Sequence, residues 1–145
     1  MNAGDVWGVV LAGGAGTPFW PLSTPTTPKQ FLPLVTDEPL LADTVSRFAP
    51  MIAAARTLVV TGASLTEAAH DAAPAIPREN ILGEPRPAGT AAALAWAATV
   101  IESRHPGAVM CCVHADWTIG NPQRFRETLA AAVALASERG TLVTV

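Results

Sequence analysis

The sequence predicts an α/β protein with a Rossmann-like, mostly parallel sheet and helices on both faces. Short apolar runs alternate along the chain with segments of helical spacing, which is the order produced by right-handed βαβ crossovers. The 145 residues, 50% of them hydrophobic and 14% charged, are enough for one domain with its own core. A formal net charge of −3 excludes a nucleic-acid protein that relies on a dense basic face.

The first half of the chain supplies two strands and two helices. Residues 6–11 form an apolar, β-branched run that ends in a glycine-rich loop, and this predicts a buried strand. Six prolines between positions 18 and 39 exclude a long helix and predict a loop held at intervals. Residues 40–48 then predict a helix, 57–61 a second buried strand, and 64–73 a second helix.

The next part repeats the alternation. Residues 80–82 predict a short third strand, and the Ala-rich stretch 90–104 predicts a helix. Residues 107–113 predict a strand without polar alternation, which is typical of a sheet covered on both faces.

The last helix has signals at both ends. Asn121 is a capping residue, Pro122 suits the first helical position, and Gly140 ends a helix that reaches Arg139. Residues 141–145 predict one more strand. Because the chain ends on this apolar stretch, we expect it to be a truncated part of a larger protein, with an open sheet edge that favours self-association.

No membrane span or secretory signal is predicted. Every long apolar stretch is interrupted before about 18 residues accumulate, and the N-terminus lacks a basic region followed by an apolar one. The expected location is cytoplasmic. Cys111 and Cys112 are neighbours in an apolar run, so we expect them to act as small buried hydrophobic residues.

A glycine-rich loop follows the first predicted strand. Gly13, Gly14 and Gly16 allow a tight turn that presents backbone N–H groups to an anion. Their spacing matches neither the dinucleotide fingerprint nor the P-loop, so a plain glycine turn is the alternative.

Two charged residues are further candidates for the site, one in the proline-rich loop and one after a predicted strand. Lys29 is the only lysine of the chain and lies in the proline-rich loop, where its ammonium group would neutralise phosphate oxygens; the alternative is a solvated surface charge. Asp116 comes directly after the apolar strand, and a carboxylate there is a candidate Mg²⁺ ligand or a capping group. His114 lies two residues earlier on the same side of the predicted strand end, and we expect it to pack locally.

Taken in order, these motifs resemble one family. They are Leu-Ala-Gly-Gly-Ala-Gly-Thr at 11–17 with Trp-Pro-Leu-Ser at 20–23, Pro-Lys-Gln-Phe-Leu-Pro-Leu at 28–34, Glu-Pro at 84–85 with Gly-Thr-Ala at 89–91, and Ala-Asp at 115–116. They resemble the N-terminal part of the sugar-phosphate nucleotidyltransferases, most closely the mannose-1-phosphate guanylyltransferases. The resemblance covers nearly the whole chain and implies that residues 1–145 are the N-terminal nucleotide-binding part of a catalytic domain whose sugar-binding half follows.

The resemblance implies an enzyme that forms GDP-mannose and pyrophosphate from GTP and mannose 1-phosphate with Mg²⁺. The low charge and the short apolar stretches predict no nucleic-acid or membrane partner, and the sequence leaves a homo-oligomer open. Lys29 and Asp116 would be the catalytic residues, with Asp116 holding the metal. The nucleotide would be bound by Leu11, Ala12, Gly13, Gly14, Gly16, Thr17, Lys29, Glu84, Pro85, Gly89 and Thr90.

The chain departs from the family pattern at several positions. Pro18 stands where the family loop has Arg, Ala88 and Gly89 stand where an Arg-Asn pair is expected, and His114 and Trp117 flank the Ala-Asp pair in place of Pro and His. We therefore expect weakened catalysis rather than lost nucleotide binding, and Pro18→Arg in a complete chain to raise turnover. The alternatives are a non-catalytic nucleotide-binding fragment and another hexose-1-phosphate nucleotidyltransferase.

Overall fold

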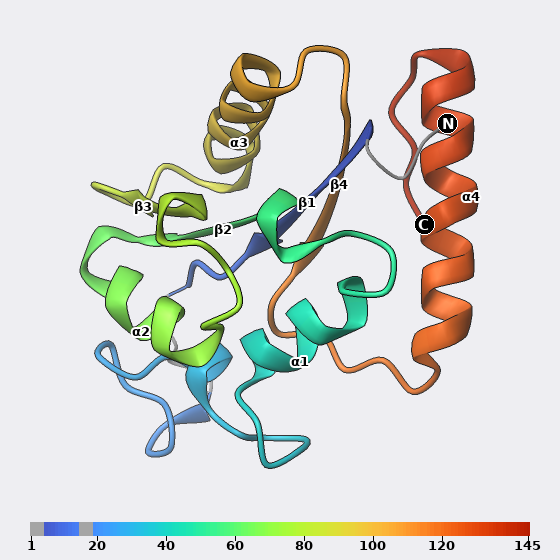
Figure 1. Ribbon diagram of the computed structural model, residues 1–145. Coiled ribbons are helices and arrows are strands. Elements are labelled where there is room, and N and C mark those ends of the chain that lie inside the picture. The colour runs from blue at the N-terminus through green and yellow to red at the C-terminus, as the bar shows by residue number, and fades with distance from the viewer. Residues whose placement is uncertain (1–4, 15–18) are drawn as a thin grey trace.

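The computed structural model describes residues 5–14 and 19–145 and contains a four-stranded parallel sheet between helices (Figure 1). Its strands follow the spatial order β3-β2-β1-β4, and all neighbours pair in parallel. The strands are β1 (Val6–Leu11), β2 (Thr57–Gly62), β3 (Ile81–Glu84) and β4 (Val109–His114). The predicted fold class is confirmed.

Four α-helices connect or follow these strands in the described residues. They are α1 (Leu40–Phe48), α2 (Thr66–Ala72), α3 (Thr90–Arg104) and α4 (Pro122–Arg139). Both predicted ends of α4 are confirmed: the Asn121 side chain accepts a hydrogen bond from the Arg124 backbone N–H at 2.9 Å, and Gly140 adopts a left-handed conformation with φ 59°.

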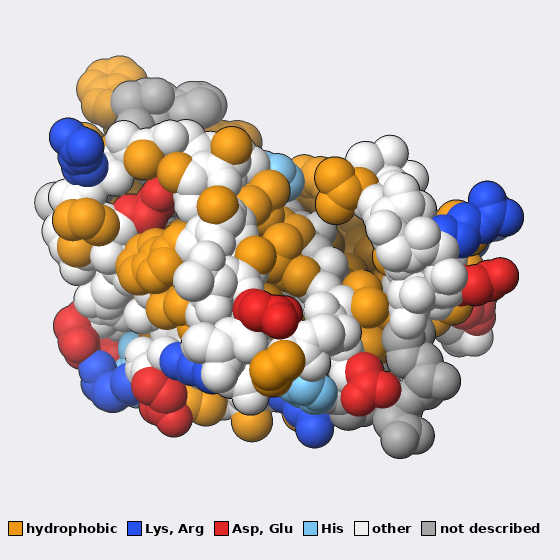
Figure 2. Space-filling model, turned by 90° about the horizontal axis from the view of Figure 1, so that it is seen from above, with side chains coloured by type: hydrophobic (Ala, Val, Ile, Leu, Met, Phe, Trp, Pro, Cys, Tyr) orange, Lys and Arg blue, Asp and Glu red, His pale blue; other side chains and the backbone are white. Residues whose placement is uncertain are grey.

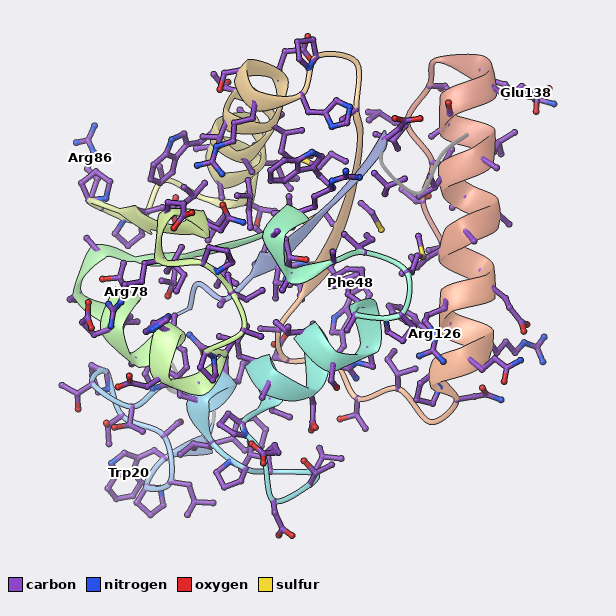
Figure 3. The ribbon with its side chains drawn as sticks, viewed as in Figure 1. Trp20, Phe48, Arg78, Arg86, Arg126 and Glu138 are labelled. Carbon is purple, nitrogen blue, oxygen red and sulfur yellow. The ribbon has the colours of Figure 1, made fainter. Side chains whose placement is uncertain are left out.

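The sheet separates two hydrophobic clusters, and β1 contributes alternate residues to both. Val10 packs on one face together with α1, α2 and α4, where Phe48 is fully buried between α1 and the sheet (Figure 3). Val9 packs on the other face, which α3 covers through Ala97 and Ile101. This alternation follows from the two-residue period of a strand.

The predicted strand at residues 141–145 is wrong. This segment has no strand structure and runs back beside α4 (Figure 1). Val143 and Val145 line a shallow groove with α4 side chains, whereas Leu142 is 99% exposed. A strand needs a neighbouring backbone to satisfy its N–H and C=O groups, and residues 141–145 pair with none of the described strands.

The sheet is covered on both faces, as residues 107–113 predict, but β4 itself is covered incompletely. On the face shared with α3, Met110 and Cys112 of β4 are only half-buried, because α3 lies over β1 and β2. Seen from above, hydrophobic side chains gather in a hollow between α3 and α4 (Figure 2). Ala108 and Met110 line an open pocket together with Ile101 and other side chains of α3.

The cysteines are free thiols with different burial. Cys111 is buried in the core as predicted, and burial raises its pKa to about 11. Cys112 is half-buried, and its burial together with the neighbouring Cys111 raises its pKa to about 12. Across the described ranges 5–14 and 19–145, we find no helix with the length and apolar character needed to cross a membrane.

The strand register brings four carboxyl ends to one edge of the sheet. Leu11 at the end of β1 lies beside Val60 of β2 and His114 of β4, while Glu84 of β3 lies beside Gly62 of β2. The strand order reverses at β1, because β2 and β3 lie on one side of it and β4 on the other. Parallel sheets bind ligands at such a switch point.

Candidate functional site

A pocket of about 190 Å³ lies at this edge between the ends of β1, β3 and β4. Most of the predicted nucleotide-binding residues within the described part of the chain line it: Leu11, Gly13, Gly14, Glu84, Gly89 and Thr90. Val60 and Ala93 add apolar surface, and His114 closes the side toward β4. The structure therefore brings together segments that are far apart in the sequence.

Two glycines shape the pocket through backbone conformations that other residues rarely adopt. Gly14 has φ 143° and Gly89 has φ 87°. Gly89 immediately precedes α3, so the first turn of this helix borders the pocket, and unpaired N–H groups at a helix start favour anions. A Cβ atom on Gly13 would lie 3.9 Å from a carboxylate oxygen of Glu84, which shows that the loop and the end of β3 face each other.

Three predicted nucleotide-binding residues of the described part do not line this pocket: Ala12, Pro85 and Lys29. Ala12 is buried beneath it, and its carbonyl oxygen accepts hydrogen bonds from Gln30 Nε2 at 2.7 Å and from Thr61 Oγ1 at 3.1 Å. Pro85 is exposed in the turn after β3, and Pro87 lines the pocket instead. Ala12 thus anchors the base of the loop rather than contacting the pocket.

Gln30 connects the loop to the predicted lysine. Residues 29–31 form a single 3₁₀ turn, and the buried Gln30 side chain ties this turn to the end of β1. Lys29 Nζ then reaches Asp116 Oδ2 at 2.5 Å, with the two side chains 26% and 32% exposed. The two residues with the sharpest predicted roles therefore form one ion pair beyond the end of β4.

The electrostatics of this pair keep the carboxylate charged. Partial burial opposes ionisation of Asp116, but the hydrogen bond and the charge of Lys29 outweigh it and lower the pKa of Asp116 below its ordinary value. His114 packs locally as expected, with its ring centroid 5.5 Å from that of Trp117.

The donor set suits a phosphate-bound metal rather than a metal caged by protein. Asp116 offers a carboxylate of which one oxygen contacts Lys29. Within residues 5–14 and 19–145, no group of three or more His, Cys, Asp or Glu side chains is arranged to hold a metal ion. Mg²⁺ in phosphate-transfer sites uses one or two carboxylates and completes its shell with water and substrate phosphates, so the residues present fit Mg²⁺ of that kind.

Residues 15–18 of the glycine loop, which include Gly16, Thr17 and Pro18, lie outside the described residues. The stretch that follows is described, and its ends differ: Ser23 is buried, whereas Trp20 is 79% exposed and points outward at the rim of the molecule (Figure 3).

Several residues near the site are given no role by the sequence analysis. Thr61 is predicted only as part of a strand, and Gln30 is named only as part of the motif that contains Lys29. Thr44 and Arg47 of α1 contact the backbone around Asp116. The sequence does contain one signal for them: Thr44 lies within the apolar stripe of its helix, and Arg47 follows one turn later. This spacing predicts that the two side chains share a helix face, but not which part of the chain that face contacts.

Comparisons with known proteins identify the family of this chain. Residues 7–145 match the model of the nucleotidyl transferase family, and the chain belongs to that family. The xanthan biosynthesis protein XanB of Xanthomonas campestris pv. campestris is 36% identical over 141 residues, which cover 97% of this chain and 30% of that protein. A mannose-1-phosphate guanylyltransferase of Sinorhizobium fredii is 34% identical over 140 residues, covering 93% of this chain and 27% of the relative.

A solved structure shows the same fold. A crystal structure described as mannose-1-phosphate geranyltransferase from Thermus thermophilus superposes with a TM-score of 0.81 at 34% identity, covering 92% of this chain and 39% of the other. The predicted family resemblance is confirmed. The chain spans about 30% of the length of the curated relatives it matches.

Proposed function

We propose that this chain binds GTP at the carboxyl edge of its sheet and provides the nucleotide half of a mannose-1-phosphate guanylyltransferase site. The observation that carries the proposal is the convergence of Gly13, Gly14, Glu84 and the start of α3 on one pocket. The names of the relatives support the choice of guanylyl transfer. As part of the same proposal, the protein acts in the cytoplasm, where GTP and sugar phosphates occur.

In this proposal the base and the phosphates occupy different sides of β1. The base packs against Leu11, Val60 and Ala93, and the Glu84 carboxylate accepts hydrogen bonds from the adjacent N1–H and N2–H groups of guanine. Uracil and thymine offer one N–H at the corresponding edge, so this contact favours guanine. The phosphates lie along the glycine loop toward Lys29.

The proposed reaction is an in-line displacement at phosphorus. An oxygen of mannose 1-phosphate forms a bond to the α-phosphorus of GTP, and the bond from that phosphorus to the bridging oxygen breaks so that pyrophosphate leaves with the electron pair. Lys29 donates hydrogen bonds to phosphate oxygens, and Asp116 holds Mg²⁺, which neutralises phosphate charge when bound. Catalysis of this kind depends on positioning and charge stabilisation.

A nucleotide-binding module without transfer activity is a second candidate. The observation that favours it is Pro18, because the family loop has Arg at this position and proline supplies no cation for the phosphates. The two candidates share the nucleotide pocket and differ in the chemistry that follows binding.

The first experiment is calorimetric titration of the chain with GTP, dTTP, UTP and ATP in the presence of Mg²⁺. We expect GTP to bind at least about 10-fold more tightly than UTP, which corresponds to one additional charge-assisted hydrogen bond. Absence of GTP binding by a chain with a folded circular dichroism spectrum would contradict the proposal. Incubation with GTP and mannose 1-phosphate then separates the candidates, since only the enzyme releases pyrophosphate.

A further inference from the structure

Two side chains of α1 hold the backbone on both sides of Asp116. Thr44 Oγ1 donates a hydrogen bond to the Ala115 carbonyl oxygen at 3.2 Å, and Arg47 Nη1 donates to the Trp117 carbonyl oxygen at 2.9 Å. Arg47 Nη2 also donates to Thr44 Oγ1 at 2.5 Å, so the two side chains form one connected group. We infer that Thr44 and Arg47 are positioning residues that fix the Asp116 carboxylate where it can hold Mg²⁺; this inference rests on the proposed function.

The need for such a support follows from where the sheet ends. The Ala115 N–H donates to the Leu11 carbonyl oxygen at 3.0 Å, which is the last hydrogen bond between this segment and β1. Beyond it the chain leaves the sheet, and the direction of the Asp116 side chain depends on the two peptide planes beside it. Thr44 fixes the carbonyl group of the plane that precedes Asp116, and Arg47 fixes the Trp117 carbonyl group, one peptide unit beyond the plane that follows Asp116.

The two contacts are unequal in environment. Thr44 is 2% exposed and Ala115 is 1% exposed, so their hydrogen bond is shielded from water. Arg47 is half-buried, and this burial lowers its pKa although the nearby Asp43 opposes the shift. The guanidinium remains charged at neutral pH, so its hydrogen bonds are charge-assisted, and its planar fork reaches two acceptors at once.

The two cations near Asp116, Lys29 and Arg47, act on it in different ways. Lys29 contacts the Asp116 carboxylate directly, whereas Arg47 contacts only the backbone next to it. Removing Arg47 therefore leaves the ion pair chemically intact and changes its placement. Replacing a residue that orients a metal ligand without contacting the metal lowers metal affinity by about 10- to 100-fold.

The test uses Thr44→Val and Arg47→Gln, with Arg47→Lys as the conservative variant and Ser46→Ala as the matched control on the same helix. Ser46 is exposed, and its hydroxyl donates to the Asp43 carbonyl oxygen of its own helix. For each chain, GTP affinity is measured with Mg²⁺ and with EDTA, and hydrogen–deuterium exchange is followed at residues 115–118.

We expect the gain in GTP affinity caused by Mg²⁺ to fall about 10-fold in Thr44→Val and Arg47→Gln, while binding in EDTA stays unchanged. Exchange at residues 115–118 should become faster in both variants. Arg47→Lys should recover part of the gain because an ammonium group can reach one carbonyl, and Ser46→Ala should match the unmodified chain.

Equal losses with Mg²⁺ and with EDTA, or unchanged exchange at residues 115–118, would overturn the inference and leave the two side chains a purely structural role. An unmodified chain that binds no GTP would instead overturn the proposed function. In that case, binding of Mn²⁺ alone, followed by electron paramagnetic resonance, decides the positioning claim: weaker binding in Thr44→Val and Arg47→Gln than in Ser46→Ala supports it, and equal binding overturns it.

Discussion

The two sides of β1 at the carboxyl edge are built by different means. Toward β3 the pocket side consists of glycine backbone, apolar side chains and the carboxylate of Glu84. Toward β4 the charged side consists of the Lys29–Asp116 pair, with α1 holding the backbone around it. In the proposed function, the pocket side selects the base by shape and hydrogen bonding, and the charged side contributes affinity for phosphate. Substitutions on the two sides should therefore change different properties of the chain.

The largest effect is expected on the charged side, from Lys29→Ala. We expect GTP affinity in Mg²⁺ to fall about 100-fold, because charge-assisted hydrogen bonds to phosphate are lost and Asp116 is left without its counter-charge. Calorimetry measures this loss. The control is Arg139→Ala, an exposed cation at the end of α4, which should bind as the unmodified chain does. Equal losses in both variants would mean that Lys29 contributes only net charge.

Gly83→Ala tests the shape of the pocket side. A Cβ atom at Gly83 would lie 2.8 Å from Thr66 Cγ2 and 2.9 Å from Ala63 Cα, so the backbone next to Glu84 must move. We expect the free energy of unfolding to fall by about 2 kcal/mol, a typical cost of overpacking. Urea denaturation measures it. Gly120→Ala is the matched control, because a Cβ atom there meets nothing within 4 Å. Similar stabilities for both variants would contradict the prediction.

Glu84→Gln tests whether the pocket side selects the base. We expect the preference for GTP over UTP to fall about 10-fold through weaker binding of GTP, because one charge-assisted hydrogen bond to guanine is lost. Competition titrations with both nucleotides give the ratio. Glu138→Gln on the exposed face of α4 is the control. If GTP and UTP weaken together, Glu84 acts on the phosphates or on folding instead.

The smallest effect is the acid sensitivity of the charged side. Because the pKa of Asp116 is lower in the folded chain than in the unfolded one, the pair stabilises the fold fully above the ordinary aspartate pKa of about 4. This stabilisation is lost as the pH falls through the lowered value. Since both side chains are partly exposed, we expect it to be below about 1 kcal/mol.

Unfolding of the chain and of Asp116→Asn at pH 6 and at pH 2 measures this contribution. The difference in unfolding free energy between the two chains should shrink at the lower pH. A difference that stays the same at both pH values would show that the pair does not contribute through the charge of Asp116.

Most of the fold could be predicted because its signals are local. The apolar run of β1, the capping Asn121 and the terminating Gly140 each specify structure within a few residues. The stretch 141–145 has the same apolar character as a strand, but a strand also requires a partner, and local pattern contains no information about that.

The candidate site also has one part that local sequence signals predict and one part that they do not. Its pocket side comes from motifs that follow strand ends, so parallel pairing alone brings them together. The support of Asp116 joins Thr44 to a carbonyl 71 positions later and Arg47 to one 70 positions later. Helical spacing shows that Thr44 and Arg47 share a face, but only the packing of α1 against the end of β4 shows what that face holds.

The outer side of β4 has a consequence for how the molecule meets other chains. Among the described residues β4 pairs with β1 alone, so on its other side no strand pairs with its N–H and C=O groups, which lie beside half-buried Met110 and Cys112. Its sequence, VMCCVH, contains neither the lysine nor the proline that discourages pairing at open edges. A strand added there, from another segment or another molecule, would turn β4 into an interior strand and move the Lys29–Asp116 pair from the margin of the sheet to its centre.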